Sequence, residues 1–238
     1  MNKVICKSCS SENYFEAYKC SSCSNVLRAK VSNIDFWSVL YQMLFDTENA
    51  FKQILYANNK NFLIPLFILL NLKFASLLFV LGSIYDLEIS FSLFWGALLA
   101  LMVILCIIMF IYLEFIRTVI NKLFLQNLFR KNYLSVIVYA SSIFSLSIFV
   151  LLTIELVLFG PFLFSGNPSP FDIKPIPAYI IAGLEILVLA LFLIFSFIGF
   201  KIYLQSIRMS VIVTLSAILI IPILFFLSKH FFSLIMVV

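Results

Sequence analysis

The sequence predicts an all-α membrane protein of five transmembrane helices, with amphipathic juxtamembrane helices and a small cysteine-rich module at its N-terminus. Two observations lead to this fold class. Hydrophobic residues make up 63% of the 238 positions and charged residues only 11%, whereas a soluble domain carries roughly 25% charged residues. The first 31 residues are polar and hold four of the five cysteines. The composition therefore excludes a soluble globular protein.

These shifts in composition divide the chain into three regions. Residues 1–31 form the cysteine-rich module, residues 32–61 form a juxtamembrane linker, and residues 62–238 form the five-span membrane domain. Each region has its own sequence pattern.

The cysteine-rich module has the spacing of a metal site. Cys6, Cys9, Cys20 and Cys23 form two C-x2-C pairs that are separated by ten residues. Four thiolates at this spacing are the ligand set of a zinc ribbon, and a closed four-cysteine site leaves no position for a substrate. We therefore expect one structural zinc ion. The alternative is a disulfide framework, which a reducing cytoplasmic location disfavours; Cys106 lies in an apolar stretch and is expected to pack as a small apolar residue.

The linker has apolar residues at helical spacing. The segment 32–35 resembles a capping box that starts a helix, and a polar break follows at 46–49. The recurring apolar positions are Phe36, Trp37, Leu40, Met43 and Leu44, then Phe51, Ile54 and Leu55. This pattern predicts two short amphipathic helices. They either lie on the inner leaflet or pack against the cytoplasmic ends of the spans.

Five apolar stretches are long enough to cross the hydrocarbon core, which takes about 20 helical residues. These stretches are 62–84, 91–113, 134–159, 178–202 and 211–227. The last one leaves two alternatives, because the apolar sequence resumes after Lys229 and His230. Residues 211–238 form either one long tilted span or a shorter span followed by an interfacial tail. Pro222 predicts a kink within this last span.

Lysine and arginine alternate in abundance between the predicted connections. Seven precede the first stretch, none lies between the first and second, four lie between the second and third, one lies between the third and fourth, and two lie around the fourth connection. Because basic residues stay on the cytoplasmic side, we expect a cytoplasmic N-terminus and an outside C-terminus. Residues 117–131 interleave these basic residues with apolar ones, which predicts an interfacial helix facing anionic lipid.

Three charged residues fall within the predicted spans: Lys73, Glu155 and Glu185. A charge at the bilayer centre is costly, so such residues are paired or functional. We expect an ion pair between Lys73 and Glu185, and we expect Glu155 to reach water at the outer interface. The alternative is an ion or proton path through these residues.

No catalytic pattern occurs in the chain. His230 is the single histidine, and there is neither a glycine-rich phosphate loop nor a nucleophile elbow. We therefore expect no enzymatic activity. The module holds five basic and two acidic residues without a dense basic stripe, which disfavours nucleic acid as a partner. The expected partners are the lipid bilayer and a protein at the cytoplasmic face, and a homo-oligomer is left open.

Several segments resemble the YIP family, the Ypt/Rab-interacting membrane proteins. They are the amphipathic stretch 49–54, the span that begins Phe62-Leu63-Ile64-Pro65, the basic stretch leading into Tyr139-Ala140-Ser141, and the five-span count. The resemblance covers residues 45–235 and implies a prokaryotic-like member with an N-terminal zinc ribbon, located in the cytoplasmic membrane. The chain has Ile143-Phe144 where a proline is expected, and it lacks the acidic-aromatic-glycine motif of eukaryotic members. Rab binding is therefore not implied.

The sequence favours an integral membrane adaptor or scaffold whose cytoplasmic zinc ribbon contacts protein partners. Two alternatives belong to other classes. One is a small transporter or channel that uses Lys73, Glu155 and Glu185. The other is a lipid-organising protein that shapes the membrane through its interfacial helices.

Overall fold

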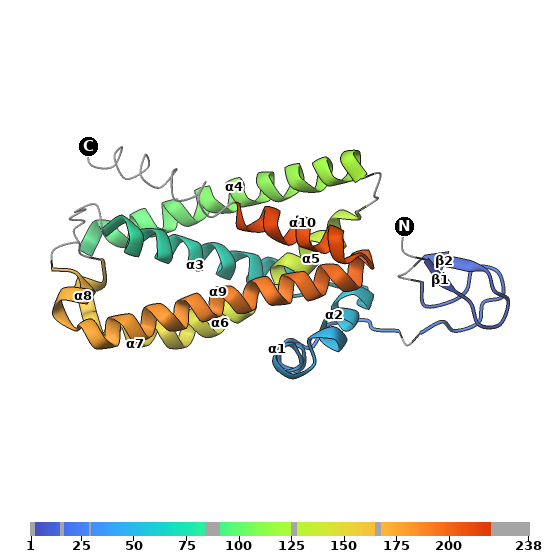
Figure 1. Ribbon diagram of the computed structural model, residues 1–238, viewed down its shortest axis with the longest axis horizontal. Coiled ribbons are helices and arrows are strands. Elements are labelled where there is room, and N and C mark those ends of the chain that lie inside the picture. Colours follow the sequence, from blue (N-terminus) through green and yellow to red (C-terminus); the bar gives the residue numbers. More distant parts are fainter. Residues whose placement is uncertain are drawn as a thin grey trace.

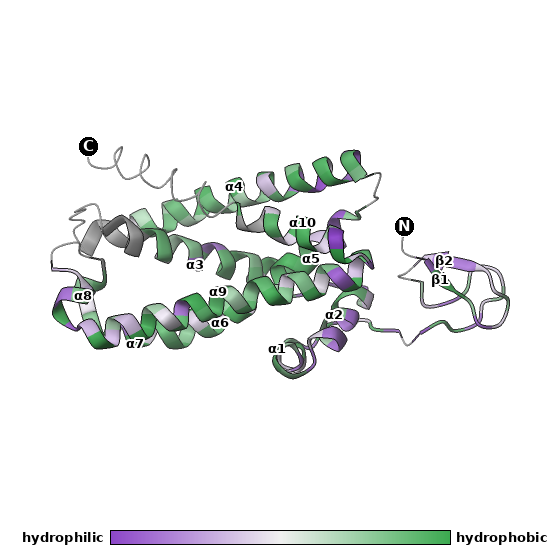
Figure 2. Cartoon of the chain, in the orientation of Figure 1, coloured by the Kyte–Doolittle hydropathy of each residue, from purple (hydrophilic) through white to green (hydrophobic). Residues whose placement is uncertain are grey.

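The computed structural model describes residues 3–14, 17–28, 30–83, 91–124, 128–164 and 168–219. It consists of an elongated bundle of helices and a small module that lies beyond one end of the bundle (Figure 1). Apolar residues run along the bundle helices, whereas polar residues gather in the module and at the helix ends nearest to it (Figure 2). The predicted boundaries between the module, the linker and the membrane domain stay predictions.

The module is built on a two-stranded antiparallel sheet. Strand β1 (Lys3–Ile5) pairs with β2 (Glu12–Tyr14), and Val4 lies opposite Asn13. A second loop closes through an isolated antiparallel bridge between Lys19 and Val26. A two-stranded hairpin is marginally stable by itself in water, so this module needs a further source of stability.

The segment that follows the module is held to the bundle by backbone and amide contacts. Val31 forms a parallel bridge with Ala57, and Asn58 N donates to Val31 O at 3.1 Å. The Asn61 side chain accepts from Ile34 N and donates to Ile34 O, both at 3.1 Å. These contacts hold residues 31–34 outside a helix, and the first helix begins only at Phe36. The predicted start at a Ser32 cap is therefore wrong.

The two predicted linker helices are present and have different surroundings. They are α1 (Phe36–Phe45) and α2 (Thr47–Tyr56), and the Asp46 side chain caps α2 by accepting from Asn49 N at 3.3 Å. Helix α2 packs against α5 and α9 of the bundle and buries Phe51 completely. Helix α1 packs on α2 but leaves one face exposed.

The bundle follows the predicted apolar stretches with shifted ends. Its elements are α3 (Leu63–Ser83), α4 (Phe91–Phe124), α5 (Arg130–Ala140), α6 (Ile143–Leu146), a π-helical turn η1 (Ser147–Leu151), α7 (Leu152–Phe159), a 3-10 turn η2 (Gly160–Phe164), α8 (Pro170–Ile173), α9 (Pro175–Leu204) and α10 (Ile207–Ile218). The connection between α7 and α9 contains two short helical segments among its described residues, η2 and α8.

Within the described residues, three helical segments are long and apolar enough to cross a membrane. They are Gly96–Phe124, Arg130–Leu163 and Pro175–Leu204. Leu63–Leu78 and Ile207–Ser216 are apolar but shorter. The count of five spans therefore stays a prediction. Pro222, Lys229 and His230, and with them the form of the predicted last span, lie outside the described residues.

The predicted interfacial helix at 117–131 is wrong. Helix α4 continues without a break to Phe124, and Arg130 already belongs to α5. Continuity is favoured by an ion pair one turn apart, in which Arg117 Nη2 lies 2.8 Å from Glu114 Oε2. The third stretch begins at Arg130 rather than at 134, and a turn at Ser141 and Ser142 interrupts it.

Candidate metal centre and buried ion pair

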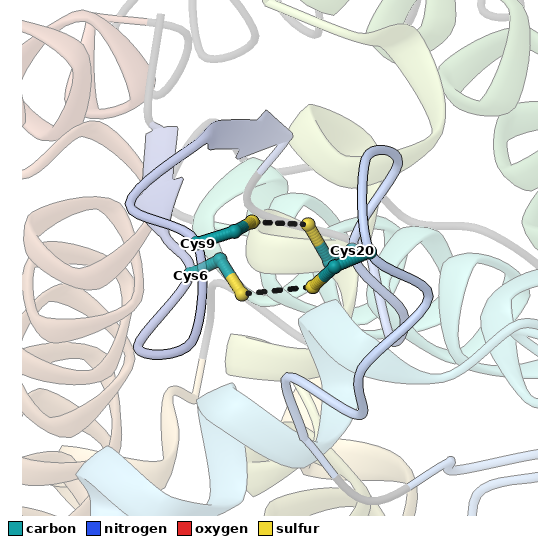
Figure 3. Close-up of side chains that lie close together, drawn as sticks. Cys6, Cys9 and Cys20 are labelled. Carbon is teal, nitrogen blue, oxygen red and sulfur yellow. Dashed lines mark hydrogen bonds between the residues drawn. The ribbon is translucent and has the colours of Figure 1, made fainter.

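The four cysteines of the module lie in one cluster. All four Sγ atoms lie within 4.8 Å of one another. Cys6 Sγ is 3.6 Å from Cys23 Sγ, and Cys9 Sγ is 3.5 Å from Cys20 Sγ (Figure 3). Tetrahedral zinc with Zn–S bonds of 2.3 Å places its sulfurs roughly 3.8 Å apart. The described cysteines are all free, so the cluster is close enough to hold one metal ion and its geometry is consistent with zinc.

Two loops of the same conformation supply these cysteines. In the first loop, Cys6 N donates to Ser11 O, and Ser10 N donates to Cys6 O. In the second loop, Cys20 N donates to Asn25 O, and Ser24 N donates to Cys20 O. The distances are 3.0 and 2.9 Å in the segment 6–11, and 2.9 and 3.0 Å in the segment 20–25. Ser10 and Ser24, which follow the second cysteine of each pair, have φ values of 54° and 55°. The repeated C-x2-C-Ser sequence thus folds twice into one ligand-presenting turn.

Asn13 joins the two loops beneath the cluster. Its Oδ1 accepts from Ser21 N at 2.7 Å and from Ser21 Oγ at 3.0 Å, while its Nδ2 donates to Ser11 O at 3.0 Å. Asn13 is buried, because its side chain leaves the inner face of β2. Asn13 was not predicted from the sequence to take part in the site. Its position in a strand between the two cysteine pairs was the available signal.

Ser11 favours the thiolate form of a cysteine. Its hydroxyl lies 3.0 Å from both Cys9 Sγ and Cys20 Sγ. The Ser11 hydrogen bond is the main influence that lowers the pKa of Cys20 to about 5. The thiolate is the form that binds a metal, so the Ser11 hydrogen bond favours metal binding by Cys20.

The second polar site lies inside the bundle. Lys73 Nζ, from α3, lies 2.5 Å from Glu185 Oε1, from α9, and their side chains are 8% and 17% exposed. The predicted ion pair between them is therefore present. Ser147 Oγ, at the start of the π-helical turn, donates to the same Glu185 oxygen at 2.9 Å. Sequence analysis did not assign Ser147 to this site, although it lies two helical turns before Glu155.

Glu155 lies near this pair but does not join it. It is 9% exposed and therefore buried in the protein, so the expectation that it reaches water is wrong. Within the described part of the chain it forms no hydrogen bond or ion pair, and its carboxylate interacts electrostatically with Lys73 and Glu185. The α7 helix turns this side chain inward, which the apolar sequence around it does not reveal.

Fold and site together define a class: a helical protein with segments of membrane-spanning length and an N-terminal four-cysteine cluster that can hold a metal. No protein-family model, curated protein or solved structure matches the chain. The resemblance to the YIP family accordingly stays a prediction.

Proposed function

We propose that this chain is a membrane-embedded adaptor whose zinc ribbon binds a protein partner at the cytoplasmic face. One structural zinc ion, bound by Cys6, Cys9, Cys20 and Cys23, holds the ribbon in its fold. The function is binding rather than catalysis, because four protein ligands complete a tetrahedral zinc shell.

The observation that carries this proposal is an apolar surface on the outer side of the ribbon. Ile5 and Tyr14 are each 65% exposed and Val26 is 63% exposed. Because side chains alternate along a strand, Ile5 and Tyr14 share the face of the sheet opposite to the buried Asn13. Lys3 and Glu12 form an ion pair on the same face. Apolar side chains framed by charges, on a module that projects from the bundle, suit a protein contact.

Charge supports the cytoplasmic placement of the ribbon. Exposed basic residues occur on four helices where these approach the ribbon end of the bundle (Figure 2). They are Lys122, Arg130, Lys131, Lys201 and Arg208. At the opposite end, the described connection holds Asp172 and Lys174, which balance each other. Basic residues near span ends favour the cytoplasmic side.

The test compares the partners of the full chain with those of a chain that lacks residues 1–27. The cut keeps Arg28, whose guanidinium carbon lies 4.2 Å from the centre of the Tyr56 ring, and it keeps the Val31 bridge to Ala57. The bundle should therefore stay folded. Both proteins are purified in nanodiscs, and bound proteins are identified by quantitative mass spectrometry.

The adaptor proposal predicts a stoichiometric partner that is recovered with the full chain and is not recovered with the chain that lacks residues 1–27. Tyr14→Ser should reduce its recovery several-fold while bound zinc stays at one ion per chain. Lys7→Ala, which changes an exposed residue on a metal-binding loop, is the matched control. Recovery that is equal with and without the ribbon would exclude this function.

A second candidate, a small transporter, is favoured by one observation in the bundle. Near the Lys73 and Glu185 pair lies a third buried ionisable residue, Glu155, for which the described residues supply no hydrogen bond. This function predicts ion or proton flux into liposomes that survives removal of residues 1–27 and is lost in Glu185→Gln. Flux equal to that of protein-free liposomes would eliminate it.

A further inference from the structure

Helix α1 has two apolar faces, and only one of them is covered. Val39 and Met43 are buried on the side that packs on the bundle, and Ser142 Oγ lies 3.1 Å from Met43 Sδ. On the other side, Trp37, Tyr41 and Phe45 are 74%, 65% and 74% exposed. Residues spaced by four lie on one stripe of a helix, and the rings of Tyr41 and Phe45 are 4.7 Å apart. We call Trp37, Tyr41 and Phe45 the aromatic stripe.

Exposure of the aromatic stripe to water is unfavourable. The helix FWSVLYQMLF contains no charged residue. Within the described residues the aromatic stripe is exposed. An exposed stripe of large apolar side chains marks a surface that contacts a protein or a membrane.

The direction of α1 indicates what covers it. In Figure 1 α1 is seen almost end-on, whereas α3, α4 and α9 run across the view. If the long helices cross a bilayer, α1 lies parallel to the membrane surface. This is the orientation of an interfacial helix, and tryptophan and tyrosine are enriched at the membrane interface.

The aromatic stripe is continuous with the apolar surface of the bundle. The Phe36 ring lies 5.4 Å from the Trp37 ring and 5.3 Å from the Phe62 ring, which immediately precedes α3. One residue into α3, Ile64 is 70% exposed. Trp37 is therefore joined through Phe36 and Phe62 to the side of the bundle that would face lipid.

Charges near α1 complement an anionic lipid surface. The exposed basic residues Lys131, Lys201 and Arg208 lie at the same end of the bundle as α2. Of the nearby acids, Asp46 caps α2, Glu48 faces Lys52 at 4.0 Å, and the exposed Asp35 directly precedes α1. Basic residues at this depth attract anionic headgroups.

We propose that the aromatic stripe of α1 inserts into the headgroup region of the bilayer, so that α1 lies in the membrane interface. The inference goes beyond the adaptor function, because it concerns lipid and not the protein partner.

Tryptophan fluorescence tests this inference on the full chain. The chain has two tryptophans, Trp37 and Trp95, so a Trp95→Phe variant reports on Trp37 alone. It is reconstituted into vesicles of phosphatidylcholine and phosphatidylglycerol, with bromine either near the headgroup or near the end of the acyl chain. We expect stronger quenching by the shallow bromine than by the deep bromine, and little quenching by iodide in the buffer.

Two outcomes would overturn the inference. Quenching by iodide without quenching by bromolipid would place Trp37 in water. Protection from both quenchers would show that protein, a second copy or another chain, covers the stripe. As a second readout, Tyr41→Asp in the same background should reduce shallow quenching at least twofold, whereas Tyr14→Asp on the ribbon should leave it unchanged. Equal quenching in all three proteins would also contradict the proposal.

Discussion

The ribbon and the bundle are stabilised by different means. The described buried side chains of the ribbon include Cys6 and Cys20 of the four-cysteine cluster and the amide of Asn13, so this cluster takes the place of an apolar core. The bundle instead buries a large apolar cluster that runs from α1 to α10 and a smaller one that includes Phe159 and Ile181. Buried polar groups are exceptions among these apolar side chains. Changes in one region should therefore leave the other folded.

Removal of a buried cysteine should have the largest effect. We expect Cys20→Ser to lose the zinc ion and to unfold the ribbon, because structural zinc sites contribute about 10–16 kcal/mol to the folding of such modules. Elemental analysis measures the bound metal, and limited proteolysis within residues 3–28 measures the ribbon fold. Cys106→Ser is the control, since Cys106 lies on α4 away from the cluster. Loss of the bundle fold in Cys20→Ser would contradict the independence of the two regions.

Breaking the ion pair should affect the bundle alone. We expect Lys73→Met or Glu185→Gln to lower the free energy of unfolding by about 3 kcal/mol, because each leaves a buried charge without its partner. The double variant should lower the free energy of unfolding by much less than the sum of the two single effects. Equilibrium unfolding in detergent measures this free energy for the unchanged chain, the two single variants and the double variant. Additive losses would show that the two charges do not interact.

The contact between α2 and α9 offers a smaller test on the bundle side. A Cβ atom at Gly199 would lie 2.7 Å from side-chain atoms of Phe51 and of Val136. We expect Gly199→Ala to lower the free energy of unfolding by about 1–3 kcal/mol through overpacking. Gly183→Ala is the matched control, because nothing lies within 4 Å of its added Cβ. If the two variants unfold alike, α2 is not packed against α9 in the way described.

The smallest expected effect is an increase in the zinc affinity of the ribbon. Ser10 and Ser24 have a left-handed backbone, which side chains other than glycine adopt at a cost. Ser10→Gly and Ser24→Gly should therefore each strengthen zinc binding by less than about 1 kcal/mol. Competition with a chelator measures the affinity. Ser22→Gly, outside the left-handed positions, should give no gain, and weaker binding in the first two variants would argue against the loop conformation.

Local patterns predicted those features that depend on residue spacing or on charge. The two C-x2-C pairs predicted one cluster because short loops bring both pairs to the same point. The ion pair between Lys73 and Glu185 was predictable, because a charged side chain inside an apolar helix is costly without a partner of opposite charge. The amphipathic pattern after residue 35 likewise predicted two helices.

Features that depend on tertiary packing were not predictable in this way. Helices α1 and α2 have similar apolar spacing, yet only α2 meets Gly199, whose missing side chain admits Phe51. Asn13 and Ser147 are ordinary polar residues in sequence, and only their neighbours in space give them partners. Helix α4 continues past its apolar part because Glu114 and Arg117 pair along it. In each case the deciding contact comes from a side chain that the local pattern does not identify.

X-ray absorption at the zinc edge on the purified full chain tests the central claim most directly. That claim is that the ribbon folds around one ion held by four thiolates, whereas the bundle folds without it. The account predicts one zinc per chain with four sulfur neighbours at about 2.3 Å. Protein with an intact helical bundle and a protease-resistant ribbon but no bound metal would contradict it, as would a zinc shell containing nitrogen or oxygen.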